Sequence, residues 1–220
     1  MKYHVFGCSL SHGIWWDQFI DAEFNVQAIP AGDNTTQCRR FQDEVLENKI
    51  SNMDFVIWQV TYPSRLGFRL RPGHHFIKTN PGHNNFHQAN RNLLDNQSHV
   101  DYVAFNEEWY KTFYQVENIN QELQNLLFHL KMAASITKGK LLVWFAQHDM
   151  MARDESKNFV SWLQKEQIEY VEPAQSIMTW CKTAKKQMDE DQLHPTPESY
   201  KIYVKNILEP RINEIIKRNI

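Results

Sequence analysis

Short apolar runs alternate along this chain with longer stretches of helical periodicity. The apolar runs predict strands at Tyr3–Phe6, Phe24–Ile29, Asp54–Val60, Lys140–Ala146 and Ile168–Val171. The helical pattern covers His12–Ala22, Thr35–Asn48, about 107–135 and Pro197–Ile216. The runs at 54–60 and 140–146 are almost continuously apolar, as expected of strands buried on both faces of a sheet. The alternation favours an α/β fold in which helices connect parallel strands.

The pattern breaks over about 61–105, a stretch rich in Pro, Gly, Asn and His. In a compact domain, a segment this long without regular structure is usually either functional or wrongly assigned. It begins where a central strand ends, which is where ligands bind in open α/β sheets. We therefore expect an excursion over an active site, with a helix around Phe86–Leu94.

Composition narrows the class of protein. The chain has 220 residues, 42% of them hydrophobic, which predicts one domain over 1–220 and excludes disorder. The formal charge of −2 argues against a nucleic-acid surface, and no apolar run has the length of a membrane span. We expect neither nucleic acid nor membrane as a partner, and the sequence leaves the oligomeric state open.

Three cysteines, Cys8, Cys38 and Cys181, are too few and too scattered for a disulfide framework or a zinc ribbon. The first apolar run is needed as a strand, which leaves no signal peptide. These features predict a cytoplasmic protein, with export by another route left open.

Ser9 lies on a predicted strand-to-helix turn, in Gly7-Cys8-Ser9-Leu10-Ser11. Such a turn exposes the hydroxyl and sets the backbone N–H near a helix N-terminus, where negative charge is stabilised. Ser9 thus offers a nucleophile and one oxyanion donor. The alternative is that Ser9 or Ser11 only caps a helix that begins at His12.

Gly32 follows the second predicted strand, in Ala31-Gly32-Asp33-Asn34. A glycine lets backbone approach a ligand closely, so its N–H could be a second oxyanion donor. The alternative is an ordinary turn in which Asp33 or Asn34 caps the next helix.

His194 supplies a base near the other end of the chain, three residues after Asp191. At that spacing on one helical turn the carboxylate can orient one ring nitrogen while the other serves Ser9. Asp189 and Glu190 are rival partners for the histidine.

These three blocks together resemble the SGNH/GDSL hydrolase family. Gly7-Cys8-Ser9-Leu10-Ser11-His12-Gly13 is similar to its Gly-Asp-Ser block, Ala31–Thr36 to the block with the oxyanion glycine, and Asp191-x-x-His194-Pro195 to the block with the acid and base. The resemblance covers nearly the whole chain. It implies a flavodoxin-like three-layer sandwich with a central parallel sheet, and ester hydrolysis through an acyl-enzyme.

Two positions depart from the family pattern. Cys8 replaces the Asp beside the nucleophile, which leaves the chemistry intact because the catalytic Asp is the one near the His. After the third strand the family has Gly-x-Asn, whose Asn is a third oxyanion donor, but this chain has Thr61-Tyr62-Pro63. Proline donates nothing, and losing one such donor costs on the order of 100-fold in rate. Substitute donors are Thr61, Asn34, Ser64 and Arg65, and Arg65 could instead hold an anionic part of the substrate.

Some aromatic and histidine residues are further candidates for binding roles. Most of the seven Trp, eight Tyr and thirteen Phe should pack in the core, while Trp15 and Trp16 are candidates for a carbohydrate-stacking wall. His83 and His87 have the spacing of helical metal ligands, but no acidic residue stands beside them as in a metalloprotease. We therefore expect neither a metal nor another cofactor.

The sequence predicts a serine esterase with a Ser9–His194–Asp191 triad, acting on a small-molecule or glycan ester such as an O-acetyl group. Two alternatives stay open. One is a binding protein that kept the fold after losing catalysis, and the other is an acyltransferase that uses the same triad.

Overall fold

The computed structural model describes residues 1–12, 14, 16, 21–28, 32–61, 66–71, 74–79, 116–146, 157–186, 188 and 194–219. Within these ranges the side chains of Ser9, His12, 66–71, 74–79, 116–118 and Lys157 are not described.

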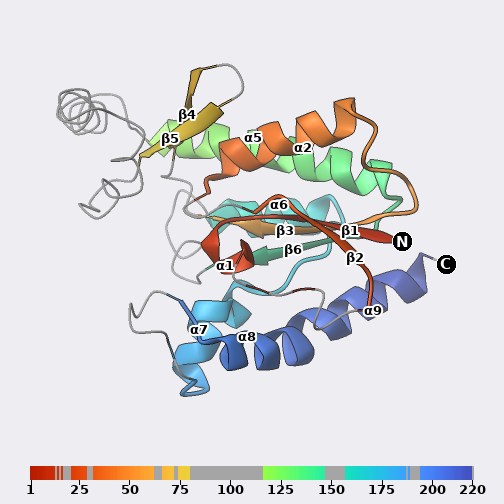
Figure 1. Cartoon of the computed structure of the whole chain (residues 1–220), viewed down its shortest axis with the longest axis vertical. Helices are drawn as coiled ribbons and strands as arrows, with labels where there is room; N and C mark the ends of the chain where they lie inside the picture. Colours follow the sequence, from red (N-terminus) through yellow and green to blue (C-terminus); the bar gives the residue numbers. More distant parts are fainter. Residues whose placement is uncertain are drawn as a thin grey trace.

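A parallel sheet forms the centre of the molecule (Figure 1). Its strands are β1 (Lys2–Phe6), β2 (Glu23–Val26), β3 (Phe55–Val60) and β6 (Leu141–Phe145), in the order β2-β1-β3-β6. Tyr170 adds a parallel bridge to Val143 on the free side of β6. This order is the doubly wound, flavodoxin-like one. The prediction of an α/β fold with a central parallel sheet is therefore confirmed.

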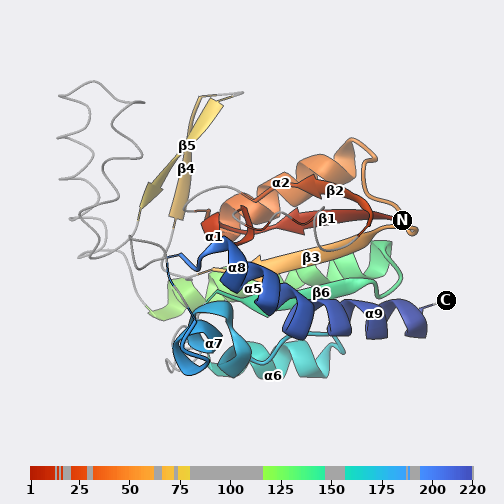
Figure 2. The ribbon, with the colours of Figure 1, turned by 60° about the horizontal axis from the view of Figure 1, so that its bottom comes forward.

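Helices cover both faces of the sheet (Figures 1 and 2). On one face lie α2 (Asn34–Leu46) and α5 (Val116–Ile136), which contact each other, and α6 (Lys157–Lys165) packs on α5. The other face carries α7 (Ile177–Thr183), after the short 3₁₀ turn η2 (Pro173–Gln175), followed by α8 (Pro197–Tyr203) and α9 (Glu209–Arg218). None of the helices in the described ranges combines the length and apolar character needed to cross a membrane.

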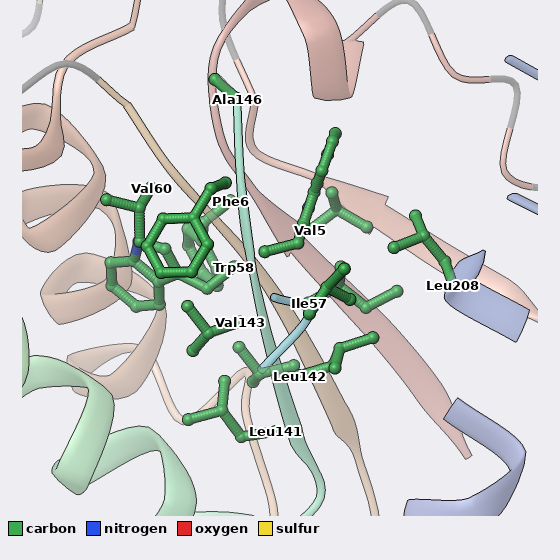
Figure 3. Close-up of a cluster of buried hydrophobic side chains, with 14 of the residues drawn as sticks. Val5, Phe6, Ile57, Trp58, Val60, Leu141, Leu142, Val143, Ala146 and Leu208 are labelled. Carbon is green, nitrogen blue, oxygen red and sulfur yellow. The ribbon is translucent and has the colours of Figure 1, made fainter. Parts of the chain in front are cut away.

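The core explains why the middle strands are so apolar. Every residue of β3 and β6 is buried, because helices cover them from both sides. On the α2 face, Phe6 and Trp58 stack with ring centroids 5.0 Å apart, and both rings meet Phe41 of α2. On the opposite face Val5 and Ile57 point toward the C-terminal helices (Figure 3). Aromatic residues thus fill the core, as the composition predicts.

The C-terminal helix predicted over Pro197–Ile216 is one continuous helix with a π-helical turn, η3 (Val204–Leu208), between α8 and α9. The N–H of Glu209 donates to the carbonyl of Val204, five residues back. Pro210 has no N–H, and its ring clashes with the carbonyl four residues before it. A widened turn ahead of Pro210 relieves this conflict.

The excursion contains regular structure that the sequence analysis did not predict. Strands β4 (Leu66–Arg71) and β5 (His74–Thr79) form an antiparallel hairpin, with Arg71 opposite His74. It lies at the end of the central sheet where β1 ends, and β4 contacts α2. The helix expected at Phe86–Leu94 falls outside the described residues, as does the beginning of the one predicted from about 107.

Candidate active site

The nucleophile turn lies at the carboxyl end of β1. That strand ends at Phe6, and α1 (Ser9–His12) begins three residues later. The helix therefore starts at Ser9, three residues earlier than predicted, and the N–H of Ser11 donates to the carbonyl of Cys8 at 3.0 Å. The turn lies at the β1/β3 switch point of the strand order, where open α/β sheets bind ligands. The backbone thus sets Ser9 at the predicted place.

Gln59, the penultimate residue of β3, holds this turn from the neighbouring strand. Its Oε1 accepts one hydrogen bond from the backbone N–H of Cys8 and another from the hydroxyl of Ser11, each 2.9 Å long. All three residues are buried. The capping role considered for Ser11 is therefore wrong, because its hydroxyl donates to Gln59 and fixes the turn against β3.

Gly7 makes this contact possible. A Cβ at Gly7 would lie 2.8 Å from Gln59 Oε1 and 2.7 Å from Ser11 Cβ, and closer still to the Ser11 hydroxyl. Side chains do not approach this closely without a shift of their neighbours. A glycine two residues before the proposed nucleophile is thus required for packing.

Gly32 lies buried in the turn that leads into α2. Asp33 caps this helix: its carboxylate accepts from the Thr36 N–H at 2.7 Å and from the Thr36 hydroxyl at 2.6 Å. The capping expected at Asp33 or Asn34 thus belongs to Asp33. The cap fixes the first turn of α2 and with it the backbone that follows Gly32.

Asn34 joins the start of α2 to the end of β3. Its Oδ1 accepts from the N–H of Thr61 at 2.9 Å and from the Thr61 hydroxyl at 3.3 Å, and its Nδ2 donates to the Thr61 carbonyl at 3.1 Å. The second Nδ2 hydrogen goes to Glu122 Oε1 of α5, at 3.0 Å. We call these contacts between Asn34, Thr61 and Glu122 the Asn34 clamp.

The clamp changes the choice of a third oxyanion donor. Both N–H groups of Asn34 are engaged by Thr61 and Glu122, and both Thr61 donors face Asn34 Oδ1. These two residues therefore hold the strand ends together instead of offering free donors to a substrate. Arg65 and Ser64 lie outside the described residues.

His194 lies half-buried, three residues before the start of α8. The next residue, Pro195, pairs with Met188 in an antiparallel bridge. Thr196 then caps α8 by accepting from the N–H of Ser199 at 3.4 Å. The bridge and the cap thus fix the backbone that follows His194. Asp191, Asp189 and Glu190 lie outside the described residues.

Trp16 does not have the role considered for it. Its side chain is 1% exposed, its indole N–H donates to the Ser11 carbonyl at 3.0 Å, and its ring stacks on Phe24. A buried ring offers no face to a sugar, so the expectation of a stacking wall is wrong for Trp16. Trp15 lies outside the described residues.

The histidine-rich excursion is described only in part, and His83 and His87 fall outside that part. Elsewhere in the described ranges no group of three or more His, Cys, Asp or Glu side chains is arranged to hold a metal ion.

Two residues of this site were missed from the sequence. Gln59 is the one polar residue in the run Phe55–Val60, and an isolated polar side chain in a buried strand needs hydrogen-bond partners. That signal was available. Glu122 gave none, since an acidic residue on a long amphipathic helix is usually solvated.

No family model and no curated protein matches the chain. Solved structures do match over nearly its whole length. They include TesA, with a TM-score of 0.56 and 13% identity over 98% of this chain and 99% of that one. The psychrotrophic esterase EstA from Pseudoalteromonas sp. matches with a TM-score of 0.52 and 11% identity, over 99% of this chain and 97% of that one. A GDSL-like lipase from Bacteroides thetaiotaomicron matches with a TM-score of 0.52 and 10% identity, over 97% of this chain and 88% of that one.

The chain has the SGNH/GDSL hydrolase fold. The resemblance inferred from its three sequence blocks is thus confirmed at the level of the fold. At such low identities, the chemistry must be argued from the residues that this chain carries.

Proposed function

We propose that this protein is an SGNH-type serine hydrolase that cleaves acyl esters. The observation that carries the proposal is the set of contacts at the carboxyl ends of β1 and β3. Gln59 fixes the Ser9 turn, the Asn34 clamp joins the Gly32 turn to β3, and His194 lies three residues before the start of α8. These contacts fix the backbone where the proposed nucleophile and oxyanion donors lie.

In the proposed reaction His194 takes the proton of the Ser9 hydroxyl while the oxygen attacks the ester carbonyl carbon. Asp191 orients the imidazole and stabilises its positive charge. The N–H groups of Ser9 and Gly32 hold the negative oxygen of the tetrahedral intermediate. Collapse expels the alcohol, which receives the proton from His194. Water, activated by the same histidine, then releases the acid and regenerates Ser9.

Arg65 is the proposed third oxyanion donor. The proline at the family's Asn position donates nothing, and the clamp engages Asn34 and Thr61. Arg65 lies two residues beyond Pro63, and its planar guanidinium can donate to a negative oxygen. A second role, holding an anionic group of the substrate, is tested below.

For the substrate we propose a small acyl ester, with O-acetyl groups on a glycan first. The Asn- and His-rich excursion offers many hydrogen-bonding groups suited to sugar hydroxyls, and Trp15 remains the candidate for stacking on a sugar ring.

A fluorophosphonate probe tests the function directly. It should label wild type at Ser9, and labelling should vanish in Ser9→Ala and fall sharply in His194→Ala. Ser135→Ala, an exposed serine at the end of α5, is the matched control and should label like wild type. Absence of labelling in a folded wild-type protein would contradict the proposal and favour a binding protein. Product analysis with an O-acetylated sugar and a free sugar acceptor then separates hydrolysis from acyl transfer.

A further inference from the structure

Glu122 lies on the second turn of α5, a helix that contributes no residue to the triad. It nevertheless reaches the site, because its Oε1 accepts the second N–H of Asn34 at 3.0 Å. An Asn side chain has two N–H donors and one oxygen acceptor. Thr61 uses the oxygen and one donor, and Glu122 takes the donor that is left. The buried amide of Asn34 is therefore fully satisfied only when Glu122 is present.

We propose that Glu122 is a positioning residue for the oxyanion site. Through Asn34 it fixes the start of α2, two residues after Gly32, and the end of β3, from which the segment carrying Arg65 departs. The kinetic consequence rests on the proposed esterase function. The structural role of the clamp does not.

The charge of Glu122 matters because of its neighbours. Burial raises the pKa of Glu122 well above its usual value, and the negative charge of Asp33 adds to the increase, while the hydrogen bond from Asn34 opposes it. On α2 the Cys38 thiol also lies near Glu122, and its pKa is raised by burial first and by Glu122 and Asp33 next. Burial thus favours the neutral acid of Glu122 over its carboxylate.

Ionisation of Glu122 would place a second negative charge beside Asp33, one residue from the Gly32 N–H. A negative charge there opposes the negative oxygen that develops in the transition state. The proposed esterase should therefore lose activity as pH rises and Glu122 ionises. This alkaline loss separates a positioning role from a merely structural one.

The test compares Glu122→Gln, Glu122→Ala and the exposed control Gln124→Ala on the same helix. Two readouts are needed: kcat and KM for a neutral aryl acetate from pH 6 to 10, and hydrogen exchange of the Thr61 backbone N–H. In Glu122→Ala, Asn34 keeps an unpaired N–H, so kcat should fall about tenfold with little change in KM. Exchange at Thr61 should become faster. Glu122→Gln should restore kcat and lack the alkaline loss, while Gln124→Ala should match wild type.

A folded Glu122→Ala with wild-type kcat and wild-type exchange at Thr61 would overturn the proposal. An alkaline loss that persists unchanged in Glu122→Gln would overturn it as well, and this comparison holds even if the alanine variant fails to fold. If wild type has no esterase activity, the proposed function fails, and the exchange rates of Thr61 in the glutamine and alanine variants still decide whether the clamp exists.

Discussion

The side-chain oxygen of Gln59 accepts a hydrogen bond from the backbone N–H of Cys8, 2.9 Å away in the turn that follows the neighbouring strand β1. The two residues are 51 apart in sequence, and both are buried. The bond attaches the residue before the proposed nucleophile to β3, a strand in which every residue is buried. The side-chain amide of Gln59 thus links the backbone around Ser9 to the core of the sheet.

Replacing Gln59 by Leu should therefore impair both stability and catalysis. The variant leaves the Cys8 N–H and the Ser11 hydroxyl without their acceptor, and each buried group left unpaired costs about 1–3 kcal/mol. A small displacement of the Ser9 turn should lower kcat by about 100-fold. Urea unfolding and aryl acetate kinetics measure the two effects.

Gln37→Leu is the matched control. Gln37 is also a buried glutamine, but within the described part of the chain its amide atoms have no hydrogen-bond partner. Removing an unpaired amide should leave stability unchanged or higher. If both variants lose stability and activity equally, the loss reflects a buried glutamine in general and not the contact with Cys8.

Gly7→Ala tests the same turn from β1. The added methyl would overlap the Ser11 and Gln59 side chains, so we expect a loss of about 1–3 kcal/mol from overpacking together with a fall in kcat. Gly139→Ala is the control, since Gly139 has φ +82° in a turn at the far end of α5. That variant should cost about 1–2 kcal/mol through backbone conformation and leave kcat unchanged. A Gly7→Ala enzyme with wild-type kcat would refute the packing argument.

The strands could be predicted because their apolar runs are set by burial on both faces. Tyr3–Phe6 and Lys140–Ala146 lie within one residue of the observed strands at each end. The hairpin in the excursion was missed. Leu66, Phe68 and Leu70 alternate with Gly67, Arg69 and Arg71 in β4, but the prolines and glycines around them indicated irregular structure more strongly.

At the site, the sequence could place glycines and caps but not side-chain partners. The Asp33 cap was among the expectations because capping is local. Asn34 and Thr61 lie 27 residues apart, and nothing in their order along the chain shows that they bond to each other. Trp16 was misjudged for a similar reason, since a tryptophan next to a nucleophile has the same sequence pattern whether its ring is buried or exposed.

Arg65→Ala separates the two roles proposed for Arg65. If the guanidinium stabilises the transition state, kcat for a neutral aryl ester should fall by a factor on the order of 100, with stability unchanged. If it holds an anionic group, KM should rise for an anionic ester and stay constant for the neutral one. Arg39→Ala, an exposed arginine on α2, provides the control. Identical kinetics of Arg65→Ala and Arg39→Ala with both esters would remove Arg65 from the site.

Acid should destabilise the protein through a buried histidine far from the catalytic residues. His4 of β1 is fully buried, with Nδ1 3.2 Å from the Asn25 amide nitrogen and 3.7 Å from a Glu44 oxygen, and Nε2 3.8 Å from Asp54. Burial lowers the pKa of His4, and the attraction of Asp54 and Glu44 only partly offsets this. His4 is therefore neutral in the folded protein at a pH where it begins to protonate in the unfolded chain.

The sign of the effect follows from proton binding. Below about pH 6.5 the unfolded state binds a proton at residue 4 that the folded state does not, so stability must fall with decreasing pH, by at most about 1.4 kcal/mol per pH unit. Asp54 contributes in a lower range: burial alone would raise its pKa, but hydrogen bonds from Ser51 and the Lys2 N–H outweigh burial and lower it. We expect His4→Gln, which cannot titrate, to have a smaller slope of unfolding free energy between pH 5 and 7 than wild type. Urea unfolding at half-unit steps measures the slopes. Equal slopes in the two proteins would show that His4 does not stay neutral in the folded state.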